Sequence, residues 1–460
     1  MATRTNRREF ARRAAASAAA GCMILAGSCS VRSFLANERL RVGLVGLGHR
    51  GSWFVQCMPR IGEEVVALCD VDLERAAEAF AAIPAAAQYQ DYRRMLDEMD
   101  DRLDAVVVAT PDHTHAVISA AAMRQGKHVY CEKPIARTVH EARTLRALAA
   151  ETGLVTQMGN QGMATDEFRR TIERIEEGAL GEIREAHVWY VFGGSGFPER
   201  PGETPPVPDH LLWDVWLGPA LDRPYHPSYL SDWWSWRDFC GGIVGGGGSH
   251  SINVVFMGLK LGTLWEAKGQ GTIRIEADAA QRTDAGFPHW QTIRYDIPAR
   301  GDLPPLTLYW HNGPQENLRE RGVWERLEKI AGRDLVWTDD SWTPESGTLL
   351  VGSRGVIHTN AHNSRCVFLP AADFPEPLGP PQRLPRSGSH EREWVRACKG
   401  GTPPLSQFSH SGPAMELLIL GNVANLVEGP IEFDPRAMRI LNHDQADRLL
   451  RPPYREGWSV

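Results

Sequence analysis

The sequence lacks the features that mark nucleic-acid-binding and membrane-spanning proteins. Its 460 residues carry a formal net charge of -7, so no positive field would attract a phosphate backbone. After the first thirty residues, no segment is apolar for long enough to span a membrane. No internal repeat is evident. At this length, with ordinary apolar and charged fractions, we expect a globular chain of two domains.

Metal-binding cysteine spacing is also lacking. Six cysteines follow the first thirty residues and none forms a Cys-x-x-Cys pair, so no metal site is predicted. Several lie on segments with the pattern of buried elements, where a thiol behaves as a small hydrophobic group. An oxidising compartment would permit a disulfide, but the sequence selects no pair. The six are Cys57, Cys69, Cys131, Cys240, Cys366 and Cys398.

Residues 1–30 have the pattern of a twin-arginine (Tat) export signal. Arg7 and Arg8 precede Phe10, and an alanine-rich apolar run follows that ends in small residues. We expect the Tat translocase to carry the chain to the periplasm or otherwise out of the cytoplasm. A basic amphipathic helix is the alternative, but the run is short and weakly amphipathic. Lipid attachment at Cys29 is a weaker expectation, because the residue three positions before it is alanine rather than leucine.

A strand, a glycine turn, a helix and a second strand follow one another over residues 41–70. Gly46 permits a tight turn, Gly48 lets the backbone approach a pyrophosphate, and Gly51 lets the helix lie close on the strand. The first N–H groups of that helix would bind the phosphates. Asp70 ends the second strand, where a carboxylate would accept the ribose hydroxyls of NAD and repel a 2′-phosphate. The pattern predicts a dinucleotide site that prefers NAD to NADP.

Strands and helices continue to alternate to about residue 158, which predicts an α/β, doubly wound parallel sheet over residues 38–160. Ligands bind outside the carboxyl ends of such strands, where the loops 110–115, 131–134 and 159–162 fall. We expect His115 to cap the helix that follows its loop. The predicted cofactor-binding residues are Gly46, Gly48, His49, Arg50, Gly51, Asp70, Thr110, Pro111, His113, His115, Glu132, Lys133, Asn160 and Gln161.

The second half has a different residue pattern, which predicts an α+β domain over residues 161–450 with an open, mainly antiparallel sheet. We expect this domain to serve substrate binding and oligomerisation. Strands are expected at 261–269, 292–297, 306–310, 348–351 and 355–358, and helices at 390–398 and 414–427. Residues 375–386 form a proline-rich connection, and residues 451–460 a C-terminal strap. The exposed face of an open sheet favours a homo-oligomer.

Two residues have the chemistry of acid–base catalysis. Lys133 follows a short strand at the ligand edge, although a surface ion pair explains it as well. His250 follows a glycine run and begins an apolar helix, where an imidazole can take a proton from a sugar hydroxyl; a capping or buried structural role is the alternative. Aromatic and polar residues of the second half could wall a carbohydrate pocket, although each is equally explained as core. These are Trp189, Tyr225, Trp236, Arg237 and Asn253, with Trp213, Trp216, Trp233 and Trp234 as further candidates.

These motifs resemble the Gfo/Idh/MocA family, which includes glucose–fructose oxidoreductase and inositol dehydrogenase. The matching segments are the glycine turn with Asp70, Thr-Pro-Asp-His-Thr-His at 110–115, Cys-Glu-Lys-Pro at 131–134 and Gly-Ser-His at 248–250. The resemblance implies a bound NAD or NADP, oxidation or reduction of a sugar or cyclitol carbinol, and catalytic roles for Lys133 and His250. Many relatives carry aspartate four residues before this histidine and again three after it, where this chain has Gly246 and Asn253.

Export and a nicotinamide cofactor together constrain the function. Free cofactor is scarce outside the cytoplasm, so we expect a tightly held cofactor that is reduced and reoxidised within one cycle. The first hypothesis is an oxidoreductase that passes hydride between two carbohydrates. The second is a redox-neutral, NAD-dependent glycoside hydrolase that works by oxidation, elimination, hydration and reduction. The third is a non-catalytic nucleotide- or sugar-binding protein, for which Gly246 is the hint.

Overall fold

The computed structural model describes residues 38–194, 201–202, 204–374 and 382–460. The predicted export signal and part of the predicted proline-rich connection lie outside the described residues. By their contacts, Ser33–Val460 form one unit, within which the two sheets below lie. The division of the chain at 160, 161 and 450 stays a prediction. No helix of the described residues is long and apolar enough to cross a membrane.

The first sheet is six-stranded and parallel, in the order β3-β2-β1-β4-β5-β6. The chain order reverses between β1 and β4, and ligands bind at such a switch point. The predicted doubly wound α/β sheet is therefore confirmed. Its strands are β1 (Arg41–Val45), β2 (Glu64–Cys69), β3 (Ala87–Tyr89), β4 (Ala105–Val108), β5 (His128–Glu132) and β6 (Thr156–Gly159).

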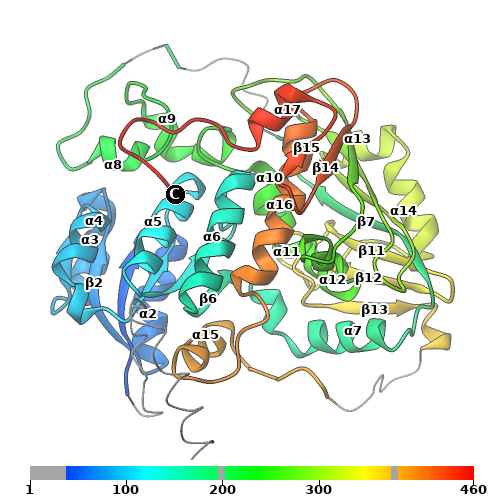
Figure 1. Ribbon diagram of the computed structural model, residues 1–460, viewed down its shortest axis with the longest axis horizontal. Coiled ribbons are helices and arrows are strands. Elements are labelled where there is room, and N and C mark those ends of the chain that lie inside the picture. Colours follow the sequence, from blue (N-terminus) through cyan, green and yellow to red (C-terminus); the bar gives the residue numbers. More distant parts are fainter. Residues whose placement is uncertain (1–37, 195–200, 203, 375–381) are drawn as a thin grey trace, which may run out of the picture. The chain divides into compact units, whose positions relative to one another are not determined.

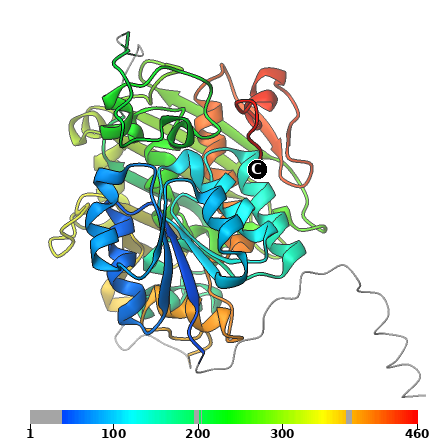
Figure 2. The same cartoon turned by 90° about the vertical axis from the view of Figure 1, so that its left-hand side faces the viewer.

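Helices cover both faces of this sheet, as Figures 1 and 2 show. Because both faces are covered, β4 is buried at every residue and reads as an unbroken apolar run. Local signals fix the helix ends: Thr138 and Glu141 form a capping box at the start of α6, and Gly153 ends it with φ 65°. The helices are α2 (Arg50–Arg60), α3 (Leu73–Ala82), α4 (Tyr92–Glu98), α5 (Asp112–Arg124) and α6 (Val139–Thr152).

The second sheet has nine strands in the order β13-β12-β11-β7-β10-β9-β8-β14-β15. Within this sheet, only the β10–β7 pair of the described strands is parallel, so the mainly antiparallel prediction is confirmed. The strands are β7 (Ile183–Val191), β8 (Ile273–Ala279), β9 (Gln291–Ile297), β10 (Leu306–Gly313), β11 (Gly347–Gly352), β12 (Val356–Asn360), β13 (Cys366–Leu369), β14 (Ile431–Asp434) and β15 (Arg439–Ile440).

One expected strand is wrong, and several short strands were not predicted. Residues 261–269 contain the 3₁₀ helix η4 (Leu261–Trp265) rather than a strand. The buried residues Leu261, Leu264 and Trp265 are three and four positions apart, which is helical spacing rather than alternation. Strands β8, β13, β14 and β15 were missed. They are short or polar on one side, so their sequence pattern is weak.

Helices also fill the second half. Helix α15 has the predicted bounds, whereas α16 begins at Phe408, six residues earlier than predicted, and contains Pro413. Trp394 of α15 packs against Tyr130 of the first sheet, with ring centroids 5.7 Å apart. The bounds are α7 (Asp166–Glu176), α8 (Trp213–Leu217), α9 (Pro227–Ser231), α10 (Gly242–Gly246), α11 (Gly248–Ser251), α12 (Asn253–Gly258), α13 (Gln315–Glu320), α14 (Val323–Ala331), α15 (His390–Cys398), α16 (Phe408–Ala424) and α17 (Asp444–Leu449).

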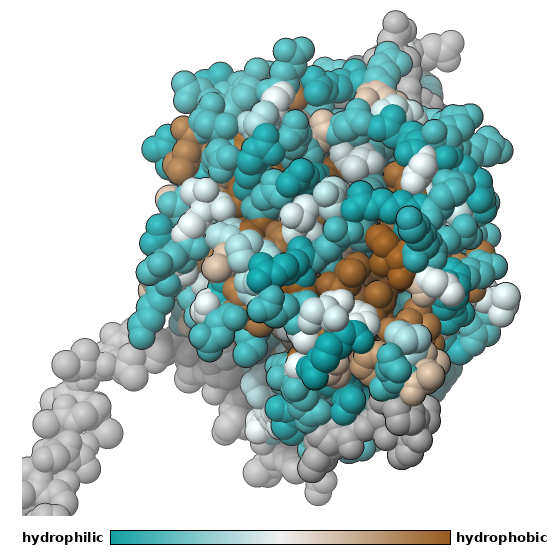
Figure 3. Space-filling view, turned by 90° about the vertical axis from the view of Figure 1, so that its right-hand side faces the viewer, coloured by the Kyte–Doolittle hydropathy of each residue, from teal (hydrophilic) through white to brown (hydrophobic). Residues whose placement is uncertain are grey.

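The outer face of the second sheet is partly covered. Helices α13 and α14 pack Leu318, Trp324 and Leu327 against Trp189 and Leu349 of the sheet. The outer face of β8, β9 and β14 instead carries ion pairs, such as Arg274–Glu276 and Arg294–Asp296. Figure 3 shows the side of the molecule on which α14 lies, where hydrophilic residues surround a hydrophobic hollow. The ion pairs on β8 and β9 make that part of the outer face polar.

Candidate active site

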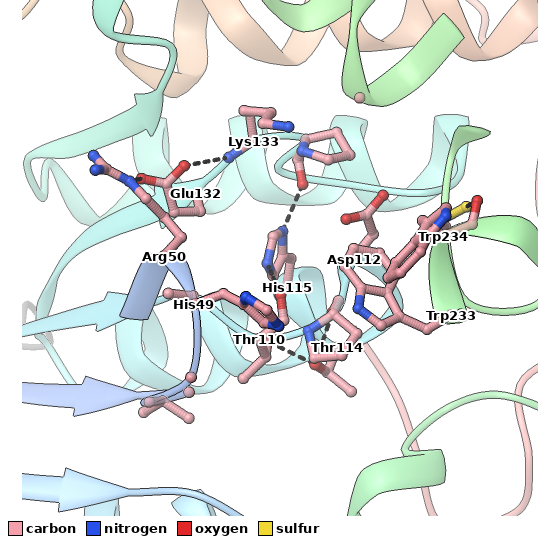
Figure 4. A pocket seen from close by; sticks show the side chains of 18 of the residues that line it. His49, Arg50, Thr110, Asp112, Thr114, His115, Glu132, Lys133, Trp233 and Trp234 are labelled. Atoms are coloured by element: carbon pink, nitrogen blue, oxygen red, sulfur yellow. Dashed lines mark hydrogen bonds and ion pairs between the residues drawn. The ribbon is translucent and has the colours of Figure 1, made fainter. Parts of the chain in front are cut away.

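A cavity of about 910 Å³ opens at the carboxyl ends of the strands of the first sheet. The glycine turn, Asp70 and the loops after β4 and β5 line one side of it. Helices α10 and α11 and two loops of the second sheet line the other side. Figure 4 shows the part of this cavity around Lys133 and Asp112. The cavity therefore combines the predicted nucleotide loops with residues from the second half of the chain.

The glycine turn has the backbone geometry of a diphosphate site. Gly46 has φ 86°, and a Cβ there would lie 2.6 Å from the carbonyl oxygen of Ala109. A Cβ on Gly51 would lie 2.0 Å from the carbonyl oxygen of Gly46, so only glycine allows α2 to start this close to β1. Helix α2 begins without a side-chain cap or an acidic residue in its first turn. The N–H groups of Gly51 and Ser52 donate to the carbonyl oxygens of Gly48 and His49, so an anion would be bound by the N–H groups just before them. With the positive end of the helix dipole, the turn fits a dinucleotide diphosphate.

Asp70 lies at the other end of the nucleotide side. Its Oδ2 accepts from the backbone N–H of Leu47 at 2.8 Å, and its Oδ1 accepts from that of Asp72 at 3.0 Å. Burial raises the pKa of this carboxyl, and the two backbone donors oppose that shift. The carboxylate lines the cavity with unused lone pairs, which fits the two hydroxyls of a ribose. Arg75 also lines this end and was not predicted from the sequence.

In the Glu-Lys-Pro segment, the charged side chains of Glu132 and Lys133 do not pair with each other. Arg50 Nε donates to Glu132 Oε1 at 2.8 Å, and Arg50 Nη2 lies 3.2 Å from Glu391 Oε1. Glu132 is thus neutralised by Arg50 rather than by Lys133. Figure 4 shows the two neighbouring side chains pointing different ways. Among the described residues, no hydrogen bond or ion pair holds the Lys133 ammonium, which is free to bind a ligand in the cavity.

His250 lies on α11 and lines the same cavity as Lys133. Burial lowers the pKa of this imidazole well below its usual value, and the positive charge of Lys133 lowers it further. Within the described chain, its buried Nδ1 has no hydrogen-bond partner. A Cβ on Gly246 would meet nothing within 4 Å, so the position where relatives carry a carboxylate is open space. The lowered pKa favours the neutral imidazole, and no carboxylate of the described residues hydrogen-bonds to its Nδ1.

Three further residues of the cavity were missed. Asp112 begins α5, accepts from the backbone N–H of Gly241 at 3.2 Å and has a pKa that burial raises to about 7, with Lys133 opposing the shift. The ring of His362 lies 4.6 Å from that of His250 and 5.0 Å from that of Trp342. Asp112 belongs to the loop 110–115, which offered a signal for it. No sequence motif marks His362 or Trp342.

Most predicted cofactor residues line the cavity, but three do not. The lining ones are Gly46, Gly48, His49, Arg50, Asp70, Thr110, Pro111, His115, Glu132, Lys133 and Gln161. Gly51 supports the turn from behind, as described above. His113 is buried with Nε2 2.7 Å from the carbonyl oxygen of Trp216, and Asn160 Nδ2 donates to Asn253 Oδ1 at 3.2 Å. The cap predicted for His115 is wrong, because the residue lies inside α5 beside the carbonyl oxygens of Thr110 and Pro134.

Of the residues predicted to contact substrate, the further candidates Trp216, Trp233 and Trp234 line the cavity, whereas the others do not. Trp189 is on the outer face of β7, under α13 and α14, because successive strand residues point to opposite faces. Tyr225 and Trp236 belong to an aromatic cluster behind the cavity, and Arg237 Nε donates to the carbonyl oxygen of Thr283. Asn253 Nδ2 donates to the carbonyl oxygens of Ser249 and His250. The Phe, Tyr and Trp residues that do line it are Tyr92, Phe192, Trp216, Trp233, Trp234 and Trp342.

The described residues contain no group of three or more His, Cys, Asp or Glu side chains arranged to hold a metal ion. The six cysteines in the described part of the chain form no disulfide with one another.

Comparisons with known proteins agree with this geometry. Residues 40–160 match the family model described as the Gfo/Idh/MocA oxidoreductase family, NAD-binding Rossmann fold, and residues 193–301 match its C-terminal alpha/beta domain. A levoglucosan dehydrogenase of Pseudarthrobacter phenanthrenivorans is 32% identical over 173 residues, which are 36% of this chain and 44% of that protein. A glycosyl hydrolase family 109 protein of Shewanella pealeana is 30% identical over 165 residues, which are 34% of this chain and 36% of that protein.

These matches span less than half the length of either relative. Among solved structures, the WlbA dehydrogenase from Bordetella pertussis, in complex with NADH and UDP-GlcNAcA, superposes with a TM-score of 0.57. The superposition covers 85% of this chain and 98% of that one at 16% sequence identity, so it shows the shared fold.

Proposed function

The chain belongs to the Gfo/Idh/MocA oxidoreductase family, and from that premise we propose that it oxidises or reduces a CH–OH group of a carbohydrate or cyclitol with NAD. One observation carries the proposal. Lys133 from the first sheet and His250 from the second half line the same cavity as the glycine turn and Asp70. An ammonium and a neutral imidazole thus face the space next to the predicted nucleotide site.

The glycine turn, the start of α2 and Asp70 would hold the cofactor. When bound, the nicotinamide supplies or accepts the hydride. Lys133 has no partner in the described chain, so its ammonium can donate a hydrogen bond to the reacting oxygen and stabilise the charge that develops there. His250 is neutral near pH 7 because its pKa is lowered, so it can accept the hydroxyl proton during oxidation and return it during reduction.

The test is to replace each group and separate turnover from cofactor binding. Lys133→Ala and His250→Ala should each lower turnover by roughly two to four orders of magnitude, the usual loss for an acid–base group, while NAD stays bound. Steady-state rates on a panel of methyl glycosides and cyclitols measure the first quantity, and nucleotide released on denaturation measures the second. Leu441→Ala, at an exposed position outside the cavity, is the control. Unchanged turnover in either variant removes that residue from the mechanism.

A second candidate function is redox-neutral cleavage of a glycoside, favoured by the presence of His362 in the cavity. Oxidation of a carbinol moves one proton to a base. Elimination of an aglycone from the oxidised sugar also needs a base for the neighbouring C–H and a donor for the leaving oxygen. Lys133, His250 and His362 together supply enough groups for these transfers. The family 109 relative is consistent with this candidate.

Paired substrates separate the candidates. Release of an aglycone from an aryl glycoside without net formation of NADH supports cleavage. Oxidation of one sugar coupled to reduction of another supports hydride transfer between carbohydrates. Bound nucleotide with neither activity supports the third alternative, a binding protein.

We further propose Tat-dependent export to the periplasm, a cofactor retained through the catalytic cycle, and a homo-oligomer. The twin arginines at positions 7 and 8 support the first, and scarce external cofactor supports the second. Replacing both arginines by lysine should keep the protein in the cytoplasmic fraction. Mass spectrometry of the small molecule released on denaturing the exported protein tests retention, and sedimentation analysis tests the oligomer.

A further inference from the structure

The packing of the fold does not explain why the side chain of Trp342 is so exposed. It is 68% exposed, more than any other large hydrophobic side chain of the described residues, and it lines the mouth of the active-site cavity. Exposed aromatic groups at a cavity mouth are characteristic of ligand-binding surfaces. An indole is especially suited to a sugar, because its flat face can pack against the C–H groups of a pyranose ring.

The loop that carries Trp342 is held in place. Asp340 Oδ1 accepts from the backbone N–H of Trp342 at 3.0 Å, and Asp340 Oδ2 accepts from Asn360 Nδ2 at 2.9 Å. The backbone N–H of Trp337 donates to the carbonyl oxygen of Pro344 at 2.8 Å, which closes the base of the loop. Trp342 is thus presented by a braced loop, so little ordering would be needed when a ligand binds.

His362 is fixed even more closely. A Cβ on Gly162 would lie 1.8 Å from the carbonyl oxygen of His362, so the glycine after β6 lets this loop lie directly on the first half of the chain. The neighbouring Asn363 accepts from the backbone N–H of Val254 through Oδ1 at 3.0 Å. These contacts tie the loop both to the nucleotide-binding half and to α12, next to the helix that carries His250.

The three rings form a triangle in which exposure rises away from His250, since the rings of His250 and Trp342 are themselves 6.5 Å apart. His250 lies against His362, and His362 lies against Trp342, with centroid separations of 4.6 and 5.0 Å. His250 is buried, His362 is half-buried and Trp342 is exposed. A sugar whose carbinol reaches His250 would have its outer end beside His362 and Trp342.

We propose that Trp342 and His362 bind a second ring of the substrate, so that the protein acts on glycosides of at least two rings rather than on free monosaccharides. This inference rests on the proposed function of the same cavity. Trp342 packs against the outer ring, and the His362 imidazole hydrogen-bonds to an oxygen between the two rings or on the outer one. Both hydride transfer and glycoside cleavage are compatible with such a substrate.

The test compares substrates that share the reacting sugar and differ only in the outer group. From panels of methyl glycosides and the corresponding phenyl glycosides and disaccharides, the sugar that the wild-type holoenzyme turns over is selected. Trp342→Ala should lower kcat/KM for the two-ring substrates roughly tenfold, mainly through KM, as expected for a lost stacking contact. Activity on the methyl glycoside should stay within about twofold. Trp342→Phe should restore most of the loss, because it keeps an aromatic face.

Two controls make the result specific. Trp290→Ala removes a tryptophan that packs under Arg321 and does not line the cavity, so it should leave both substrates unaffected. His362→Gln keeps a hydrogen-bonding side chain and should lower discrimination less than His362→Ala. Equal loss on one-ring and two-ring substrates in Trp342→Ala, or no loss on either, would overturn the inference and leave the proposed function standing. A wild-type protein that turns over none of the panel would overturn both.

Discussion

Gly246→Asp offers the sharpest test of the acid–base chemistry. Gly246 lies in α10, four residues before His250, and lines the cavity; a Cβ there would meet no atom within 4 Å. The substitution should therefore fit without a change in fold, and it would place a carboxylate beside an imidazole that has no acidic partner for its Nδ1 in the described residues.

The size of the effect follows from the geometry. Gly246 ends α10 and His250 lies on α11, but the joining Gly247 has helical dihedral angles, φ -73° and ψ -46°. The spacing is therefore taken as that of one helix, in which Cβ atoms four residues apart are about 5–6 Å apart. At an effective dielectric constant of about 20, two unit charges at that distance interact by roughly 3 kcal/mol. At about 1.4 kcal/mol per pKa unit, the carboxylate should raise the pKa of His250 by about two units. The sign is positive because an opposite charge favours the imidazolium, against the burial and the Lys133 charge that lower the pKa of His250 now.

The assay is the pH dependence of kcat/KM. Because neutral His250 is the proposed base, the acid limb of the kcat/KM profile should move to higher pH by about two units in Gly246→Asp. The titration of the His250 ring by NMR should move in the same direction. Gly246→Asn has nearly the same shape without the charge, so its limb should not move. If Gly246→Asp folds normally and neither the limb nor the ring titration shifts, His250 is not the base that this reasoning requires.

Two further predictions concern the cofactor and the fold. Asp70→Ala should weaken NAD binding by about ten- to a hundredfold, because hydrogen bonds to a charged group are lost. It should also improve the relative use of NADP. Isothermal titration with both nucleotides measures the two affinities, and an unchanged preference would place the ribose contact elsewhere. Arg169→Met should lower the free energy of unfolding by about 3–5 kcal/mol, because the fully buried Arg169 makes two hydrogen bonds of 2.6 and 2.7 Å to Glu393, whose carboxylate would be left unpaired. Urea unfolding measures the loss, and adding Glu393→Gln should recover part of it; a loss below about 1 kcal/mol would contradict the expected cost.

Some features were predictable because they depend on short stretches of chain. Gly46 and Gly51 mark a turn whose geometry is set within a few residues, and Asp70 ends the strand that follows. Lys133 comes at the end of a recognisable buried strand. His250 was identified by the glycine run before it. In each case the backbone conformation that matters is local, so residue type and spacing were sufficient to indicate it.

Other assignments failed because the deciding contacts are distant in sequence. Trp189 and Tyr190 are adjacent on β7, yet only Tyr190 points inward. Which set of alternate residues faces the core depends on how the strand pairs and on α13 and α14 behind it. The sequence pattern predicted a strand that includes residues 261–265, whereas their packing in the fold makes them helical. The sequence therefore identified the aromatic residues of the second half as candidates, but it could not show which of them line the cavity and which belong to the core.

Local sequence signals were sufficient to predict the nucleotide-binding fold, its glycine turn and the two residues proposed for proton transfer, because those signals lie within single strand–loop–helix units. Only the tertiary structure placed His362 and Trp342 against His250, since the two loops that carry them follow the helix of His250 by about a hundred residues. Their position depends on contacts such as the one between Gly162 and His362, which no local pattern encodes.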